Sequence, residues 1–256
     1  MTESAAGRPR SKGMATEPEQ QSPRVEAGSK RIRAFLGGLP VVDTVRPSLV
    51  WEVPYYPAYY LPAADLRAEL EPTGRTRHSP GLGEGRLFDV RSGGRTARDA
   101  AVRYQDSPVA QLRDLVRLDW DAMDAWFEED EEVFVHPRSP YTRIDILSSS
   151  RSVRVEIEGV TVAESSSPRV LFETGLPPRF YLPKTDVRLD LLEPGETVSH
   201  CPYKGRAEHL SARIGGRLHP DVAWTYPTPL RESAAIAGLV CFYDSRSEIT
   251  VEPVRG

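Results

Sequence analysis

The chain has 256 residues, of which 27% are charged and 39% hydrophobic, and its formal net charge is −4. This length suits one large domain or two domains of roughly 110 residues each, and domains of that size bury a core without disulfides or metals. The negative balance argues against a general electrostatic attraction to nucleic acid or anionic membranes, so we expect neither as a partner.

Cysteine content and hydropathy predict a cytoplasmic protein with reduced thiols. Two cysteines, Cys201 and Cys241, can build neither a disulfide framework nor a four-cysteine zinc site. No apolar run approaches the roughly 20 residues that span a bilayer, and the N-terminus lacks the apolar core of a secretory signal. We expect neither a metal nor a cofactor.

Residues 1–29 are rich in Ser, Pro, Gly, Glu and Arg and hold almost no large apolar side chains. Such a segment cannot bury enough surface to offset the entropy of ordering. We predict a disordered tail, and a short docking motif is the alternative.

Residues 30–118 and 151–256 are predicted to be two copies of one domain. Corresponding residues lie 121 positions apart at first (Asp65 and Asp186), and 122 apart after one residue is gained in the second copy (His78 and His200). A register held over most of two segments indicates duplication. Matching pieces include Pro-Ala-Tyr-Tyr-Leu-Pro at 57–62 with Pro-Arg-Phe-Tyr-Leu-Pro at 178–183, and Arg-Ser-Gly-Gly-Arg at 91–95 with Arg-Ile-Gly-Gly-Arg at 213–217.

Each copy has the pattern of an antiparallel all-β or α+β domain. Apolar and charged residues alternate over 153–157 and 187–191, and glycines at 159 and 215–216 mark turns. One short helix per copy is expected; in the second it would run from Arg231 to Ala237, after Pro229, and end at Gly238. The Gly-Gly pairs predict hairpin turns and not a nucleotide-binding loop.

Residues 119–150 are predicted to be a packed connecting segment. Trp120, Met123, Trp126 and Phe127 recur at helical spacing, and strands are expected at 133–135 and 144–146. The acidic run at 128–132 predicts a solvated face or pairing with arginines, with a divalent cation as the alternative. The large apolar residues favour packing on the two domains, which we expect to contact each other.

The segment at 197–205, Thr-Val-Ser-His-Cys-Pro-Tyr-Lys-Gly, carries the clearest candidates for chemistry. A thiolate is stabilised by nearby positive charge, so Lys204 could activate Cys201 if the turn folds back. The predicted catalytic residues are Cys201, Lys204 and His200: either Lys204 or His200 would stabilise the thiolate, although His200 would point to the opposite face in an extended chain. The alternatives are a structured loop with Cys201 packed as a small apolar group, or simple ligand contact.

Further candidates are polar and aromatic residues elsewhere in the second copy. Asp186 and Arg188 would share a strand face, as a ligand-orienting rim or as a structural salt bridge. Trp224 and Tyr226 would share the face of another strand, where they would either pack in the core or form the wall of a pocket. Cys241 lies in an apolar strand and is expected to be buried. The predicted ligand-binding residues are Glu173, Tyr181, Asp186, Arg188, Tyr203, Trp224 and Tyr226.

The two copies differ at the positions with most chemical capacity. Cys201 aligns with Ser79, and Trp224 with Val102; Tyr203 and Lys204 align with Gly81 and Leu82. Residues that are identical in both copies suit a scaffold or a shared site. They include Glu173, Tyr181, Asp186, Arg188, His200 and Tyr226. The differing set suits a site specific to the second copy, although drift in one copy would explain it equally well.

The second copy also resembles a bacterial and fungal family described as domain of unknown function 427, which carries a nucleotidyltransferase label. The matching pieces are Glu-Thr-Gly-Leu-Pro at 173–177, Tyr-Leu-Pro-Lys-Thr-Asp-Val-Arg at 181–188, Cys-Pro-Tyr-Lys-Gly at 201–205, Ala-Trp-Thr-Tyr-Pro at 223–227 and Ala-Ala-Ile-Ala-Gly at 234–238. The first copy resembles it more loosely, over 31–120, and the whole chain looks like tandem members from actinobacteria.

The resemblance implies two tandem β-tent-like domains, each of two antiparallel sheets meeting at an angle. Relatives of that fold often hold zinc through paired Cys-x-x-Cys motifs, which this chain lacks. It implies no activity, and no nucleotidyltransferase motif is present. Three hypotheses follow: a small-molecule-binding protein with its pocket on the second copy, a thiol enzyme with Cys201 as nucleophile, or a two-lobed interaction scaffold.

Overall fold

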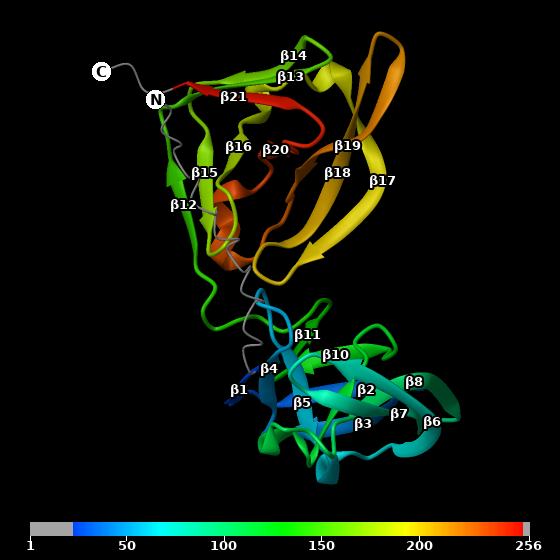
Figure 1. Cartoon of the computed structure of the whole chain (residues 1–256). Helices are drawn as coiled ribbons and strands as arrows, with labels where there is room; N and C mark the ends of the chain where they lie inside the picture. The colour runs from blue at the N-terminus through cyan, green and yellow to red at the C-terminus, as the bar shows by residue number, and fades with distance from the viewer. Residues whose placement is uncertain (1–22, 253–256) are drawn as a thin grey trace, which may run out of the picture.

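The computed structural model describes residues 23–252, which form two groups of antiparallel strands, one from each half of the chain (Figure 1). The prediction of a mainly β protein with antiparallel sheets in two tandem domains is confirmed. Helical structure in the described residues is limited to short 3₁₀ segments. We call residues 24–133 the first half, 134–143 the connecting segment and 144–252 the second half.

The first half contains a seven-stranded sheet in the order β1-β4-β5-β9-β8-β7-β6 and a four-stranded sheet in the order β11-β10-β2-β3. Its elements are β1 (Arg24–Ala27), β2 (Ile32–Leu36), β3 (Leu39–Thr44), β4 (Ser48–Trp51), β5 (Ala58–Pro62), η1 (Ala63–Asp65), β6 (Glu69–Ser79), β7 (Gly83–Ser92), β8 (Arg95–Arg103), η2 (Ala110–Leu112), β9 (Leu115–Leu118), β10 (Ala125–Glu128) and β11 (Glu131–Val133).

The second half repeats this plan. Its seven-stranded sheet has the order β12-β15-β16-β20-β19-β18-β17, so corresponding strands occupy the same positions in the long sheets of the two halves. Its smaller sheet has the order β14-β13-β21. Its elements are β12 (Ile144–Ser148), β13 (Ser152–Ile157), β14 (Val160–Ser165), β15 (Arg169–Glu173), β16 (Arg179–Leu182), η3 (Lys184–Asp186), η4 (Leu189–Leu191), β17 (Leu192–Cys201), β18 (Gly205–Ile214), β19 (Arg217–Thr225), η5 (Arg231–Ile236), β20 (Val240–Phe242) and β21 (Glu248–Glu252).

The duplication extends to a strained backbone position. Asp99 in β8 and Asp221 in β19 both have positive φ, 51° and 50°. Each lies where the pairing of its strand shifts register, β8 with β7 and β19 with β18. The Asp99 N–H donates to the Asp89 carboxylate, and the Asp221 N–H donates to the hydroxyl of Ser211. Since positive φ is costly for a non-glycine residue, its occurrence at aligned positions indicates a shared bulge that curves both long sheets.

Each long sheet packs a different cluster on each face. In the second half, one face meets the small sheet through residues such as Val155, Ala223 and Phe242. The other face carries Leu171, Tyr181, Trp224, Tyr226, Ile236 and Cys241. This second cluster has a counterpart in the first half, built from Val50, Tyr60, Val102, Tyr104, Leu112 and Leu82.

Several predicted boundaries and elements require correction. Arg24–Ala27, placed in the disordered tail, form β1 because they pair with Ser48–Trp51 of β4; residues 1–22 lie outside the described residues. The connecting segment predicted at 119–150 is largely divided between the halves, since β10 and β11 join the first and β12 the second.

Two periodicity predictions were wrong. The helical spacing at 120–127 is produced by a turn at Trp120–Met123 followed by β10, in which Trp126 pairs opposite Ala34 and stacks on Trp120 at 4.6 Å. The alternation at 187–191 falls on η4 and not on a strand, because Leu191 N–H closes a 3₁₀ turn on Arg188 O. The expected helix at 231–237 is the 3₁₀ segment η5.

Candidate functional site

Polar and aromatic side chains gather on one face of the long sheet of the second half. Directly opposed residues of an antiparallel ladder share a face. His209 in β18 lies opposite Trp224 in β19, Trp224 opposite Cys241 in β20, and Cys241 opposite Tyr181 in β16. We call this the aromatic face; its members include Tyr181, Ser199, Cys201, His209, Trp224, Tyr226 and Cys241.

Rings near the centre of the aromatic face are fixed by contacts with one another. The Trp224 indole N–H donates to the Tyr181 hydroxyl at 3.2 Å, and the two rings meet edge to face at 6.2 Å. Burial raises the pKa of Tyr181 and of Tyr226 far above the ordinary phenol value. Both phenols therefore stay protonated, and that of Tyr181 accepts the Trp224 hydrogen bond.

The turn at Pro202–Lys204 folds Lys204 back onto the sheet, where it meets Glu173 at the end of β15. The Lys204 Nζ lies 2.5 Å from Glu173 Oε2, and each side chain is only 11% exposed. A buried ammonium and carboxylate both lose hydration, so each needs the other for compensation. Lys204 is thus positioned as the partner of Glu173.

Cys201 lies at the edge of the aromatic face and is partly exposed. The three residues predicted as catalytic are not brought together: the Lys204 ammonium is held by Glu173, and His200 is exposed on the opposite face of β17, its ring 5.8 Å from Phe134. The opposite orientation of His200 follows the alternation expected for a strand. Burial raises the pKa of Cys241 strongly, and this thiol stays protonated, as expected for a core cysteine.

Tyr203 attaches the connecting segment to the second half. Its hydroxyl accepts the Ser139 N–H at 2.6 Å and lies 3.3 Å from Ser139 O, within a buried contact. The hydroxyl of Ser233 in η5 donates to the backbone carbonyl of the same tyrosine at 3.1 Å. Tyr203, predicted to bind ligand, is therefore already engaged with the protein's own backbone.

Asp186 and Arg188 do not belong to this site. They line a separate depression of about 370 Å³ beside β14, and they do not pair with each other. Asp186 accepts from Ser165 at 2.6 Å, and Arg188 pairs with Asp190 at 2.6 Å. Asp65 accepts from Thr44 in the same way, which fits the structural reading of these residues.

The aromatic face opens at Cys201 onto a cleft of about 630 Å³ that lies between the two halves, the junction cleft. The second half contributes Glu173 and Cys201, and the first half contributes Trp51, Glu52 and Tyr56. His136 of the connecting segment stacks on Tyr56 with ring centroids 3.8 Å apart. The junction cleft thus combines aromatic walls with Glu173, whose carboxylate is paired with Lys204.

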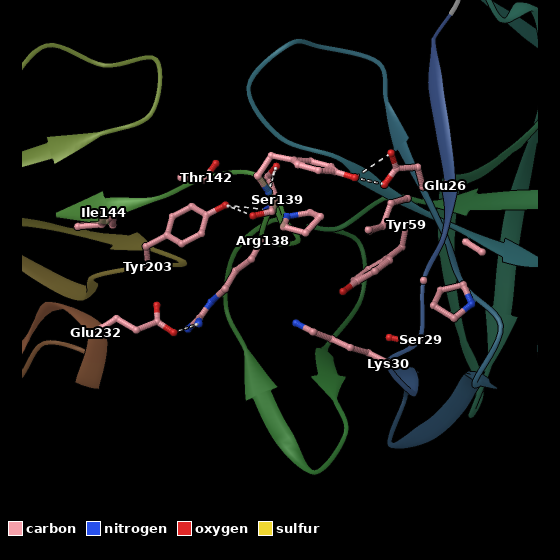
Figure 2. Close-up of a pocket in the computed structure, with 16 residues that line it drawn as sticks. Glu26, Ser29, Lys30, Tyr59, Arg138, Ser139, Thr142, Ile144, Tyr203 and Glu232 are labelled. Atoms are coloured by element: carbon pink, nitrogen blue, oxygen red, sulfur yellow. Dashed lines mark hydrogen bonds and ion pairs between the residues drawn. The ribbon is translucent and has the colours of Figure 1, made fainter.

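A second cleft of about 620 Å³ (Figure 2) shares Ser139, Tyr141, Thr142 and Tyr203 with the junction cleft. Lys30 and Tyr59 extend into it from the first half, Arg138 from the connecting segment and Glu232 from the second half (Figure 2). Its cations already have partners, since Lys30 pairs with Glu128 and Arg138 pairs with Glu232 at 3.4 Å. None of the residues named above as members of the aromatic face lines this cleft, which makes it the weaker candidate for the ligand predicted there.

Sequence reasoning missed residues that the fold brings to the aromatic face. Ser199 and His209 lie on paired strands, with a hydroxyl-to-imidazole distance of 2.9 Å, and Tyr243 packs on both His209 and Trp224. The hairpin register around the turn at 202–204, had it been predicted, would have placed Ser199 opposite Ala207 and beside His209.

Within residues 23–252, no three histidine, cysteine or acidic side chains are grouped so that they could hold a metal ion. In the same range, no helix is long and apolar enough to cross a membrane.

The fold and site define a class of protein: a duplicated all-β chain with two antiparallel sheets per half and, in the second half, a face that combines aromatic and polar side chains. The sequence profile described as a domain of unknown function, DUF427, matches residues 24–129 and again 145–253. The chain belongs to this family and contains two tandem copies of its domain. No curated protein matches the chain.

Proposed function

We propose that this protein binds a small organic molecule in the junction cleft, with the second half supplying the specific contacts. The observation that carries the proposal is the Lys204–Glu173 pair, whose side chains are each only 11% exposed and whose carboxylate residue, Glu173, lines the cleft together with Cys201. A desolvated pair costs stability compared with apolar packing, so its presence here suits recognition of a polar ligand.

The aromatic walls indicate the shape of the ligand. The stacked Tyr56–His136 rings and the Trp51 indole offer flat apolar surfaces, while the carboxylates of Glu52 and Glu173 are already compensated by cations. A planar, uncharged molecule with hydrogen-bonding groups matches this combination better than a multiply charged one. The negative net charge of the chain agrees with a partner other than nucleic acid.

Cys201 supplies a direct test, because a ligand in the junction cleft would shield its thiol. Benzamide, nicotinamide and indole are suitable planar probes, with binding followed by ligand-observed NMR and Cys201 alkylation by iodoacetamide. We expect at least one probe to bind and to slow alkylation. Loss of the Tyr56 or Trp51 ring by substitution with alanine should weaken that binding about tenfold, which corresponds to roughly 1.4 kcal/mol.

Phe172→Ala is the matched control, because Phe172 is 38% exposed against 40% for Tyr56 and does not line the junction cleft. It should leave probe binding unchanged. The proposal is wrong if none of the probes binds, or if binding neither protects Cys201 nor responds to Tyr56→Ala and Trp51→Ala.

A thiol enzyme is less well supported, since Lys204 is committed to Glu173 and His200 faces away from Cys201. The proposal for Cys201 is therefore ligand contact. We also propose that the protein is located in the cytosol, where its two unpaired cysteines would stay reduced.

A further inference from the structure

A serine and a histidine on the aromatic face form a hydrogen-bonded pair. Ser199 Oγ lies 2.9 Å from His209 Nε2 across the β17–β18 ladder. The serine is exposed to solvent, whereas the histidine is only 6% exposed. A reachable hydroxyl in contact with a buried imidazole is the arrangement required for a nucleophile and its general base.

The imidazole is held in place by packing. The Tyr243 ring lies roughly parallel to it, with centroids 6.0 Å apart and planes inclined by 24°, and Trp224 is the residue opposite His209 in the ladder. Among the described residues, His209 Nδ1 is buried and has no hydrogen-bond partner. Nε2 is therefore the ring nitrogen that faces the serine, and in the tautomer with the proton on Nδ1 it can accept the serine proton.

The pair is specific to the second half. The aligned residues of the first half are Arg77 and Leu87, which cannot form it, although the β6–β7 ladder keeps the same register as β17–β18. The duplicated fold therefore does not require a serine and a histidine at these positions. This difference favours a chemical role over a structural one.

We propose that Ser199 and His209 form a catalytic dyad that transfers acyl groups from small carboxylic esters. Oγ attacks the ester carbonyl carbon, and its proton moves to Nε2 of His209. The C–O bond to the alcohol breaks, and the departing oxygen takes that proton. A water molecule then releases the acid by the reverse proton movements. Tyr243, partly exposed beside the dyad, favours esters with an aromatic group.

This activity goes beyond ligand binding in the junction cleft and does not depend on it. The full chain is treated with an alkyl fluorophosphonate, which forms an O–P bond with a nucleophilic serine while fluoride leaves, and labelling is located by peptide mass spectrometry. Hydrolysis of p-nitrophenyl acetate is followed in parallel. We expect labelling of Ser199 and an ester hydrolysis rate that Ser199→Ala abolishes.

His209→Asn and His209→Gln should each slow both reactions by about 10²-fold or more, the usual contribution of a general base. Circular dichroism tests whether these variants fold. If they do not, Ser199→Ala still tests the dyad, because it alters only an exposed side chain. His78→Asn and Ser79→Ala, in the corresponding hairpin of the first half, are matched controls that should leave the rates unchanged.

Labelling confined to other residues overturns the dyad, as does an ester hydrolysis rate that Ser199→Ala leaves intact. The two proposals fail separately, because Trp51→Ala and Tyr56→Ala test the junction cleft without altering Ser199 or His209.

Discussion

The two halves keep the same glutamate at the end of the same strand and compensate its charge differently. In the first half, Glu52 accepts from Tyr60 at 2.9 Å and pairs with Arg117 of β9 at 3.1 Å. In the second half, Glu173 pairs with Lys204 from the β17–β18 turn, and the Tyr181 hydroxyl accepts from Trp224 instead. The ladders place Arg117 opposite Val102 and Cys241 opposite Trp224, so Arg117 occupies the position of Cys241.

This exchange shows what the fold itself requires. A buried carboxylate must have a cation, but the cation can come from a strand or from a turn. In the first half, Leu82 replaces Lys204 and is completely buried, and Val102 replaces Trp224, so aliphatic side chains fill these two positions. The second half has an ammonium and an indole at the same two positions.

The largest effect is expected from removing the cation of the second half. Lys204→Met leaves the Glu173 carboxylate buried without compensation, and we expect a loss of about 3–5 kcal/mol in the free energy of unfolding. Urea unfolding of the full chain measures this loss. The double variant Lys204→Met with Glu173→Gln should recover much of it, because no buried charge remains.

Arg117→Met is the corresponding change in the first half and should cost less, about 1–2 kcal/mol. Its pair is more exposed, at 30% for Arg117 and 18% for Glu52, and the Tyr60 hydroxyl still donates to the carboxylate. Equal losses for Lys204→Met and Arg117→Met would contradict the difference drawn between the two halves.

The sequence predicted the duplication and the mainly β fold because both depend on local alternation and on a fixed internal register. It named Cys201 and Glu173 as candidates, and both line the junction cleft, but it could not assign the partner of Lys204, which depends on how the turn at 202–204 folds onto β15. Whether this cleft binds a ligand stays a prediction.

Long-range pairing explains the larger omissions. His209 and Ser199 meet only through the hairpin register, and the contribution of Trp51 and Tyr56 depends on how the halves lie beside the connecting segment. The error at 120–127 has a similar origin, since pairing of β10 with β2 overrides a local helical spacing.

An intermediate effect is expected at the attachment of the connecting segment, which has no counterpart within the first half. Tyr203→Phe removes the hydroxyl that accepts the Ser139 N–H, leaving a buried backbone donor without its partner. The cost should be about 1–3 kcal/mol, with faster proteolysis within residues 134–143. Tyr55→Phe, at a tyrosine that is 72% exposed, should change neither property.

The smallest effect tests whether the shared bulge is equivalent in the two halves. Asp221→Ala and Asp99→Ala each keep a side chain at positive φ but remove the short polar group that tolerates this conformation, so each should cost about 1 kcal/mol. Glycine at either position should recover most of the loss, because it adopts positive φ without a Cβ clash. If alanine and glycine are equally destabilising, the lost hydrogen bond from Thr197 to Asp221, and the lost Arg75–Asp99 pair, would account for the cost instead of backbone strain. Urea unfolding measures the free energy of unfolding of each variant. If only one of the two alanine variants is destabilised, the shared φ value does not have the same energetic cost in the two halves.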